Sequence, residues 1–226
     1  MLPRPINSLI QFTLISQMPQ GKNMPKEIEL KLIIDRADID KVMAIEWLKP
    51  NLLLPWTEAK FFNTYYDTED NALLNKGYAM RIRRVGDEYY QTIKSAGKSK
   101  HGLHERDEWE WPLESDALDL TILPDELSFI KTMLLSPVFT TDFIRKQCLV
   151  EWESSTIEIA LDQGEIKVGD LEEPICELEL EIKKGEPKGL IDFAKLIKRD
   201  VTAKPFDQSK AERGYRLRKV YLANCS

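Results

Sequence analysis

The chain has 226 residues, and 42% of them are hydrophobic, which suits one large folded domain. Acidic residues outnumber basic residues 38 to 32, so the overall field of the protein repels nucleic acid and anionic lipid. The three cysteines are widely spaced, which excludes a disulfide framework or a cysteine-based zinc site and favours a cytoplasmic location, and no apolar run is long enough to span a bilayer.

The first part of the chain differs from the rest. Residues 1–23 follow neither a helical nor a strand period, whereas Met24 leads directly into an alternating segment. We therefore expect an N-terminal extension at 1–23, with Met24 as a candidate start codon, and a single domain at 24–226. An extension that packs on the domain is the alternative.

Most of the remaining chain alternates between polar and apolar residues, as strands do. Strands are expected at 27–33, 60–67, 79–85, 88–95, 103–112, 138–152, 156–161 and 175–183. A short helix capped by Asp35 is expected to end near Pro50, and further helices are expected at 124–135, 187–199 and 208–221. Gly86-Asp87 and Asp162-Gln163-Gly164 are predicted hairpin turns.

These elements predict an α+β fold that is mainly antiparallel β. About eight strands with a few helices outside fit an eight-stranded closed β tunnel, or barrel, with helices packed outside. An antiparallel sandwich is the alternative.

Four of the predicted strands carry one wholly charged face, because residues two apart point the same way in a strand. These faces are Glu27, Glu29 and Lys31; Arg81 and Arg83; Arg106, Glu108 and Glu110; and Glu177, Glu179, Glu181 and Lys183. Two carboxylates about 4 Å apart repel by roughly 4 kcal/mol at an effective dielectric near 20. Stacked carboxylates therefore indicate a bound cation in a charged interior, although solvated outer faces are the alternative.

An acidic wall facing a basic wall would suit a metal-bound polyphosphate. Carboxylates without histidine or cysteine among them favour Mg²⁺ or Mn²⁺. Arginine and lysine neutralise phosphate oxygens. The candidate phosphate-binding residues are Lys31, Arg81, Arg83, Lys94, Arg106, Arg145, Lys183, Lys204 and Lys210. His101, His104 and Glu105 lie close together, but the lack of further ligands favours a solvated turn over a zinc site.

Eight blocks in order resemble the CYTH family, also called triphosphate tunnel metalloenzymes. They are Glu-Ile-Glu-Leu-Lys at 27–31 and the blocks at 64–68, 80–83, 91–94, 106–110, 162–164, 177–181 and 209–215. Together they cover about residues 24–220. The blocks at 106–110 and 209–215 look most like the bacterial inorganic triphosphatase branch. Many members of that branch carry a helical, histidine-containing C-terminal domain, which is lacking here, so long-chain polyphosphate binding is not expected.

The resemblance implies roles for particular residues. Metal ligands would be Glu27, Glu29, Asp162 and two of Glu177, Glu179 and Glu181. Triphosphate contacts would be Lys31, Arg81, Arg83, Lys94, Arg145 and Lys204 or Lys210. Glu108 and Glu110 would orient a second metal ion or its water. In the thiamine triphosphatase branch a lysine and a tyrosine act together as the general base, a role that would fall to Lys94 and Tyr65.

The sequence thus predicts metal-dependent hydrolysis of inorganic triphosphate to pyrophosphate and phosphate by attack of a metal-activated water. An adenylate cyclase of the CYTH type, a thiamine or nucleoside triphosphatase and a non-catalytic polyphosphate-binding module stay open. The expected partner is a small-molecule triphosphate, not nucleic acid or a membrane, and a homodimer is left open.

Overall fold

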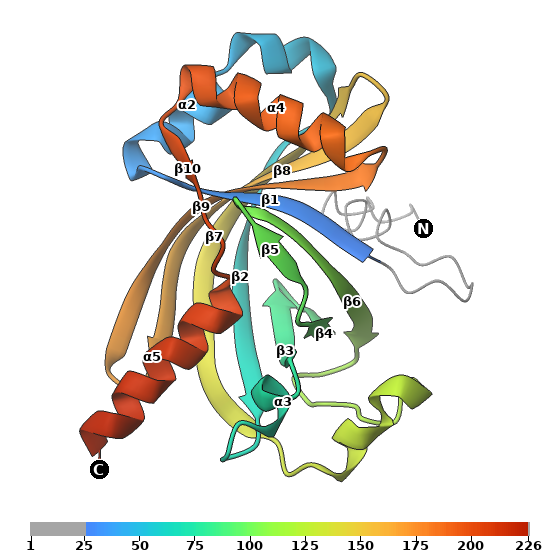
Figure 1. The fold of residues 1–226 in the computed structure, drawn as a ribbon, viewed down its shortest axis with the longest axis vertical. Coiled ribbons are helices and arrows are strands. Elements are labelled where there is room, and N and C mark those ends of the chain that lie inside the picture. Colours follow the sequence, from blue (N-terminus) through green and yellow to red (C-terminus); the bar gives the residue numbers. More distant parts are fainter. Residues whose placement is uncertain (1–25, 226) are drawn as a thin grey trace, which may run out of the picture.

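In the computed structural model, which describes residues 26–225, ten strands form one antiparallel sheet (Figure 1). The predicted extension at 1–23 lies outside the described residues. The strands are β1 (Lys26–Ile34), β2 (Leu52–Asp67), β3 (Tyr78–Val85), β4 (Glu88–Ser95), β5 (Lys98–Lys100), β6 (Leu103–Leu113), β7 (Ser136–Trp152), β8 (Ser155–Val168), β9 (Leu171–Lys184) and β10 (Ala203–Pro205).

Eight long strands close into a barrel. Their order is β1-β9-β8-β7-β2-β3-β4-β6, and β1 also pairs with β6, which completes the ring. The short strands β5 and β10 add to β6 and β1. The predicted eight-stranded closed tunnel is confirmed, and the sandwich alternative is wrong.

The helical segments differ in detail from the predicted ones. They are η1 (Arg36–Asp38), α2 (Ile39–Met43), η2 (Glu46–Asn51), α3 (Ala72–Asn75), η3 (Asp125–Thr132), α4 (Pro187–Asp200) and α5 (Lys210–Cys225). The helix predicted to end near Pro50 is broken into two 3₁₀ turns around the short α2, and the Asp35 side chain makes no capping hydrogen bond. In residues 26–225 none of the helices is long and apolar enough to cross a bilayer.

The predicted turn at Asp162-Gln163-Gly164 is wrong. Strand β8 continues through these residues, and the chain turns at Gly169, whose φ is 58°. Gly164 instead lies opposite Phe143 of β7, where an added Cβ would be 2.5 Å from the Phe143 Cα. Gly164 therefore allows the two strands to approach closely, because a residue with a side chain would clash there. Close backbone approach is a second common use of glycine in sheets.

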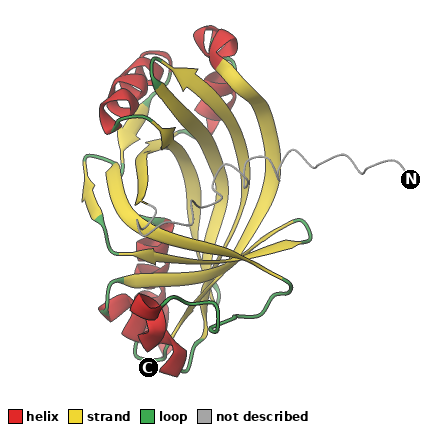
Figure 2. Ribbon diagram, turned by 90° about the vertical axis from the view of Figure 1, so that its right-hand side faces the viewer, coloured by secondary structure: helices red, strands yellow, loops and turns green. Residues whose placement is uncertain are grey.

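The main hydrophobic core lies outside the barrel wall. Leu30 and Leu32 of β1, with Leu180 of β9, pack beneath the buried face of α4, which includes Phe193. Another cluster lies beneath η3, where Leu127 covers residues of β3, β4 and β6. In Figure 2 the strands curve around the interior, with helices gathered at both ends of the view. Because the apolar faces are covered from outside, the charged faces line the interior.

Candidate active site

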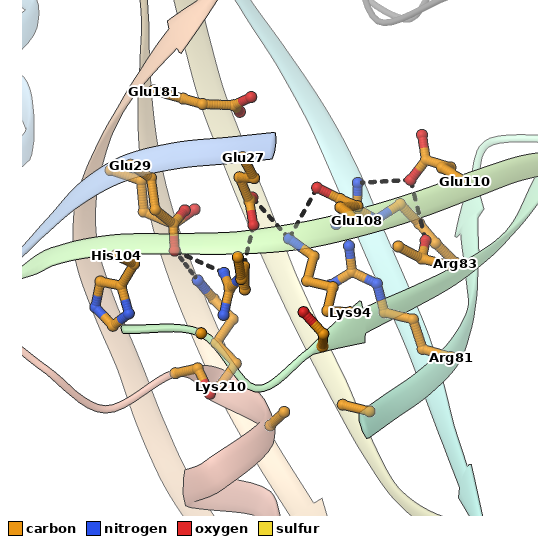
Figure 3. Close-up of a pocket in the computed structure, with 18 of the residues that line it drawn as sticks. Glu27, Glu29, Arg81, Arg83, Lys94, His104, Glu108, Glu110, Glu181 and Lys210 are labelled. Atoms are coloured by element: carbon orange, nitrogen blue, oxygen red, sulfur yellow. Dashed lines mark hydrogen bonds and ion pairs between the residues drawn. The ribbon is translucent and has the colours of Figure 1, made fainter. Parts of the chain in front are cut away.

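The barrel encloses a cavity of about 1210 Å³. Most of the predicted site residues line it, and they come from all four charged faces (Figure 3). These residues are Glu27, Glu29, Lys31, Tyr65, Arg81, Arg83, Lys94, Arg106, Glu108, Glu110, Arg145, Glu179, Glu181, Lys183 and Lys210. The structure thus brings together side chains that lie up to 183 positions apart, from Glu27 to Lys210.

Three predicted site residues are placed differently. Lys204 is exposed on β10, where it pairs with the exposed Ile33 of β1, and it does not line the cavity. Asp162 and Glu177 are buried in the barrel wall, where they are 0% and 1% exposed, and they do not line the cavity themselves. Basic side chains that do line the cavity bind them.

Asp162, Glu177 and Glu179 surround the ammonium group of Lys210, and we call these four residues the Lys210 cluster. The Lys210 Nζ atom is 2.7 Å from Asp162, 2.7 Å from Glu177 and 2.9 Å from Glu179. Oxygen atoms of the three carboxylates lie within 4.8 Å of one another, a spacing that could also hold a metal ion.

The Lys210 cluster is already neutralised by protein cations. Arg145 binds Asp162 through two nitrogens and also contacts Glu179 at 2.6 Å. Lys31 is 3.2 Å from Glu179, and Arg213 binds Glu177. Burial alone would raise the pKa of the Glu179 carboxyl, but Lys210, Lys31 and Arg145 together hold that pKa well below its ordinary value. Three carboxylates therefore face four cations, and the cluster has no deficit of positive charge.

A second set of carboxylates, which we call the glutamate cluster, lies along β1, β6, β8 and β9. It consists of Glu27, Glu29, Glu108, Glu158 and Glu181. Arg106 binds Glu27 at 2.6 Å and Glu29 at 2.7 Å, and Lys94 bridges Glu27 at 2.7 Å and Glu108 at 3.3 Å. Figure 3 shows Lys94 between these two glutamates.

The glutamate cluster has fewer cations than carboxylates. Lys183 is 2.7 Å from Glu181 and 3.8 Å from Glu158, and Lys31 is 3.5 Å from Glu29. Burial raises the pKa of Glu181 to about 8; Lys183 opposes this rise, whereas Glu158 and Glu27 add to it. Burial and Glu27 likewise raise the pKa of Glu108. Negative charge is thus incompletely balanced here, which is the condition that a hard divalent cation relieves.

Arg81 carries buried donors without partners. Its Nη1 donates to the Tyr65 hydroxyl at 3.3 Å, whereas its Nε and Nη2 are buried and have no hydrogen-bond partner among the described residues. Burial would raise the pKa of the Tyr65 phenol, but Arg81 beside it lowers that pKa. A buried guanidinium with open donors is costly unless an anion accepts from it.

Arg83 is oriented by two residues that the sequence did not single out. Its Nε donates to the Asn63 side-chain oxygen at 3.2 Å, and the Asn63 amide nitrogen donates to the Thr141 hydroxyl at 2.9 Å. Asn63 and Thr141 are both 0% exposed. This chain of two hydrogen bonds depends on the register of β7, β2 and β3, which aligns the three positions.

Glu158 was also missed. It lies alone among apolar residues of β8, so the sequence shows no charged face there. Its inward direction could have been found from Asp162, four residues later, because the two positions share a strand face.

His104 corrects one prediction. It is 5% exposed, lines the cavity and lies opposite Glu29 across the β1–β6 pair, with its Nε2 atom 3.1 Å from the Phe206 carbonyl oxygen. The solvated turn predicted for this segment is therefore wrong for His104, because β6 already begins at Leu103 and turns His104 inward.

Comparisons with known proteins agree with this architecture. A family model described as the CYTH domain matches residues 25–215. The inorganic triphosphatase of Haemophilus influenzae is 37% identical over 201 residues, which cover 86% of this chain and 55% of that protein. The present chain therefore spans about half the length of that relative.

Solved structures share the fold at low sequence identity. A candidate adenylyl cyclase from Hippeastrum with a dominant triphosphatase activity is 16% identical, with a TM-score of 0.59 over 84% of this chain and 95% of its own. A candidate adenylate cyclase from Bacillus halodurans is 16% identical, with a TM-score of 0.54 over 84% of this chain and 98% of its own. A Pyrococcus horikoshii protein is 17% identical, with a TM-score of 0.52 over 88% and 99%.

Proposed function

Because this chain belongs to the CYTH domain family, we propose that it is a metal-dependent triphosphatase that hydrolyses inorganic triphosphate to pyrophosphate and phosphate inside its barrel. The similarity to the Haemophilus influenzae inorganic triphosphatase supports this substrate. The observation that carries the proposal is Arg81, whose buried Nε and Nη2 donors have no partner among the described residues. A phosphate group would accept from both nitrogens at once.

The triphosphate would lie along the basic wall. Arg81 and Arg83 share one face of β3, and Lys94 lies on the neighbouring strand β4, opposite Ala79. Arginine forks match the geometry of phosphate oxygens, and phosphoryl transfer is catalysed mainly by positioning of the substrate and by stabilisation of the negative charge on its oxygens.

Several carboxylates that line the cavity offer the hard oxygen ligands that a divalent metal prefers. The glutamate cluster offers hard oxygen ligands with an excess of negative charge, so Glu27, Glu29 and Glu181, with Glu108 or Glu158, would hold Mg²⁺ or Mn²⁺. When bound, such an ion lowers the pKa of its water and neutralises phosphate oxygens. The Lys210 cluster would hold a cation only if Lys210 left it, and a triphosphate would offer Lys210 another anionic partner.

Glu108 would hold a proton during hydrolysis. Burial and Glu27 raise the pKa of its carboxyl, which brings that pKa closer to neutral pH, where a general base works best. Lys94, 3.3 Å from Glu108 and 2.7 Å from Glu27, would keep this carboxylate oriented. Arg81 and Arg83 would stabilise the charge that develops on the phosphoryl oxygens.

The test compares Arg81→Leu with Arg84→Leu. Arg84 follows on the same strand but stacks on Phe62, with its Cζ 5.8 Å from the ring centroid, and does not line the cavity. Phosphate release from tripolyphosphate, ATP and thiamine triphosphate would be measured with Mg²⁺ or Mn²⁺, together with cyclic AMP from ATP. We expect Arg81→Leu to lower tripolyphosphate cleavage by about 100-fold or more and Arg84→Leu to leave it within about twofold.

Three other outcomes would count against the proposal. Cyclic AMP without phosphate release would support a cyclase instead. Cleavage of ATP or thiamine triphosphate in preference to tripolyphosphate would identify an organic triphosphate as the substrate. Full activity of Arg81→Leu would remove the proposed role of the buried guanidinium.

A further inference from the structure

Two phenylalanine rings lie face to face on the wall of the cavity. Phe61 of β2 and Phe143 of β7 are cross-strand partners, and their ring centroids are 5.6 Å apart with an angle of 9° between the ring planes. They are 6% and 2% exposed, and both line the cavity.

Three cations from three different elements lie against these rings. The Arg83 Cζ is 5.2 Å from the Phe61 centroid, and the Arg145 Cζ is 5.4 Å from Phe61 and 5.8 Å from Phe143. The Lys210 Nζ is 5.2 Å from the Phe143 centroid. All of these distances fall within the range of about 6 Å in which a ring face attracts a cation.

Such an arrangement needs a source of stabilisation, because like charges in a buried site repel. Among residues 26–225, Arg83 has a single hydrogen-bonded anchor, Asn63, and its nearest carboxylate, Glu110, is 3.8 Å away. Arg145 and Lys210 are held by carboxylates of the Lys210 cluster on one side. The negative faces of the two rings supply attraction on another side without using any N–H donor. Donors of Arg83 and Arg145 that protein acceptors do not use therefore stay available for a ligand in the cavity, whereas Lys210 reaches a ligand only by giving up one of its three carboxylates.

We propose that the Phe61–Phe143 pair is a positioning element that aligns Arg83, Arg145 and Lys210 as one anion-binding row for a linear polyphosphate. This inference rests on the proposed function for its ligand. Phe61 and Phe143 do not touch the reacting atoms; they act through the three cations. Removal of a ring face would therefore weaken substrate binding more than it slows the chemical step.

The experiment uses Phe61→Leu and Phe143→Leu, which keep an apolar side chain but lose the ring. Phe61→Tyr keeps the ring face. Phe193→Leu is the matched control, because Phe193 is a fully buried phenylalanine that packs on Trp47 and Trp152 outside the barrel. KM and kcat for tripolyphosphate, its calorimetric Kd and the melting temperature would be measured for each variant.

We expect KM and Kd to rise about tenfold in each leucine variant at the cavity, with kcat within about twofold. Phe61→Tyr should restore most of the affinity, and Phe193→Leu should lower the melting temperature without changing KM. In NMR spectra, the ring-current shift of the Arg83 side chain should disappear in Phe61→Leu, whereas that of Arg145 should only decrease, because Phe143 also lies against it.

Folded leucine variants with KM and Kd within twofold of the unmodified protein would overturn the inference. If the unmodified protein releases no phosphate, the proposed function fails, and Kd then decides the inference alone. A higher Kd in Phe61→Leu would support the proposed anion-binding row. An unchanged Kd, or no binding of tripolyphosphate by the unmodified protein, would overturn the inference.

Discussion

Tyr215 of α5 donates its hydroxyl hydrogen to the Asp67 carboxylate at the end of β2, over 2.8 Å. The same carboxylate accepts backbone N–H groups of Leu73 and Leu74 at the start of α3. Asp67 is 0% exposed. One buried carboxylate therefore holds α3 and also fixes the helix whose first residue, Lys210, reaches into the cavity.

Substitution of Tyr215 by Phe removes this bond while keeping the ring. A hydrogen bond to a charged group contributes about 1.5–3 kcal/mol, so we expect the free energy of unfolding to fall by about that amount. Urea denaturation measures the change. Tyr221→Phe, on the more exposed part of the same helix, should stay within about 0.5 kcal/mol of the unmodified protein. Equal losses in the two variants would contradict the anchoring role.

Asn63→Leu tests the orientation of Arg83. The variant removes the acceptor for the Arg83 Nε and leaves the buried Thr141 hydroxyl without its donor. We expect stability to fall by about 1–3 kcal/mol and KM for tripolyphosphate to rise several-fold. Thr141→Ser keeps the hydroxyl and should behave nearly as the unmodified protein, whereas Thr141→Val should resemble Asn63→Leu in KM. An unchanged KM in folded Asn63→Leu would show that Arg83 needs no such support.

Glu181 predicts a pH dependence of stability. Burial raises its pKa from 4.5 to about 8 in the folded protein, so between these values the folded state holds a proton that the unfolded state has lost. The corresponding stability is complete below pH 4.5 and is lost as the pH rises to about 8. With a chelator present, the free energy of unfolding of Glu181→Gln, relative to that of the unmodified protein, should therefore increase from pH 5 to pH 8.5. Exposed Glu151→Gln is the control, and a flat difference for Glu181→Gln would refute the assignment.

Metal binding should release protons. Glu181 and Glu108 have raised pKa values, and a bound Mg²⁺ or Mn²⁺ would favour their ionised forms. Near pH 7 the calorimetric enthalpy of metal binding should therefore vary with the ionisation enthalpy of the buffer. Glu181→Gln should reduce the number of protons released. Metal binding without any buffer dependence would place the ion away from these two carboxylates.

Strand alternation explains why much of the barrel could be predicted from sequence. In Glu27, Glu29 and Lys31 the charged face is continuous, and the apolar face beside it identifies the buried outer side of the wall. Local sequence patterns fail to predict the role of a residue when that role depends on which residue of another strand lies opposite it. Gly164 resembles a turn residue until Phe143 is placed opposite it, and Asn63 is an ordinary polar residue until β3 brings Arg83 alongside.

The same reasoning explains the missed parts of the site. Charge balance cannot be counted along one strand, so the sequence did not reveal that Asp162 and Glu177 are shared by Lys210, Arg145 and Arg213. The role of Phe61 likewise depends on cations from β3 and β7.

The pairing of β1 on both edges has a consequence for how the chain is made. Glu27 pairs with Arg106, 79 residues later, and Glu29 pairs with Glu181, 152 residues later. During synthesis β1 can join β6 once that strand has left the ribosome, but its other edge stays open until β9 emerges. Such distant pairings slow folding. Until then the nascent chain carries the charged faces of β1, β3 and β6 on an open sheet, and the enclosed binding site comes into existence only after β9 has emerged.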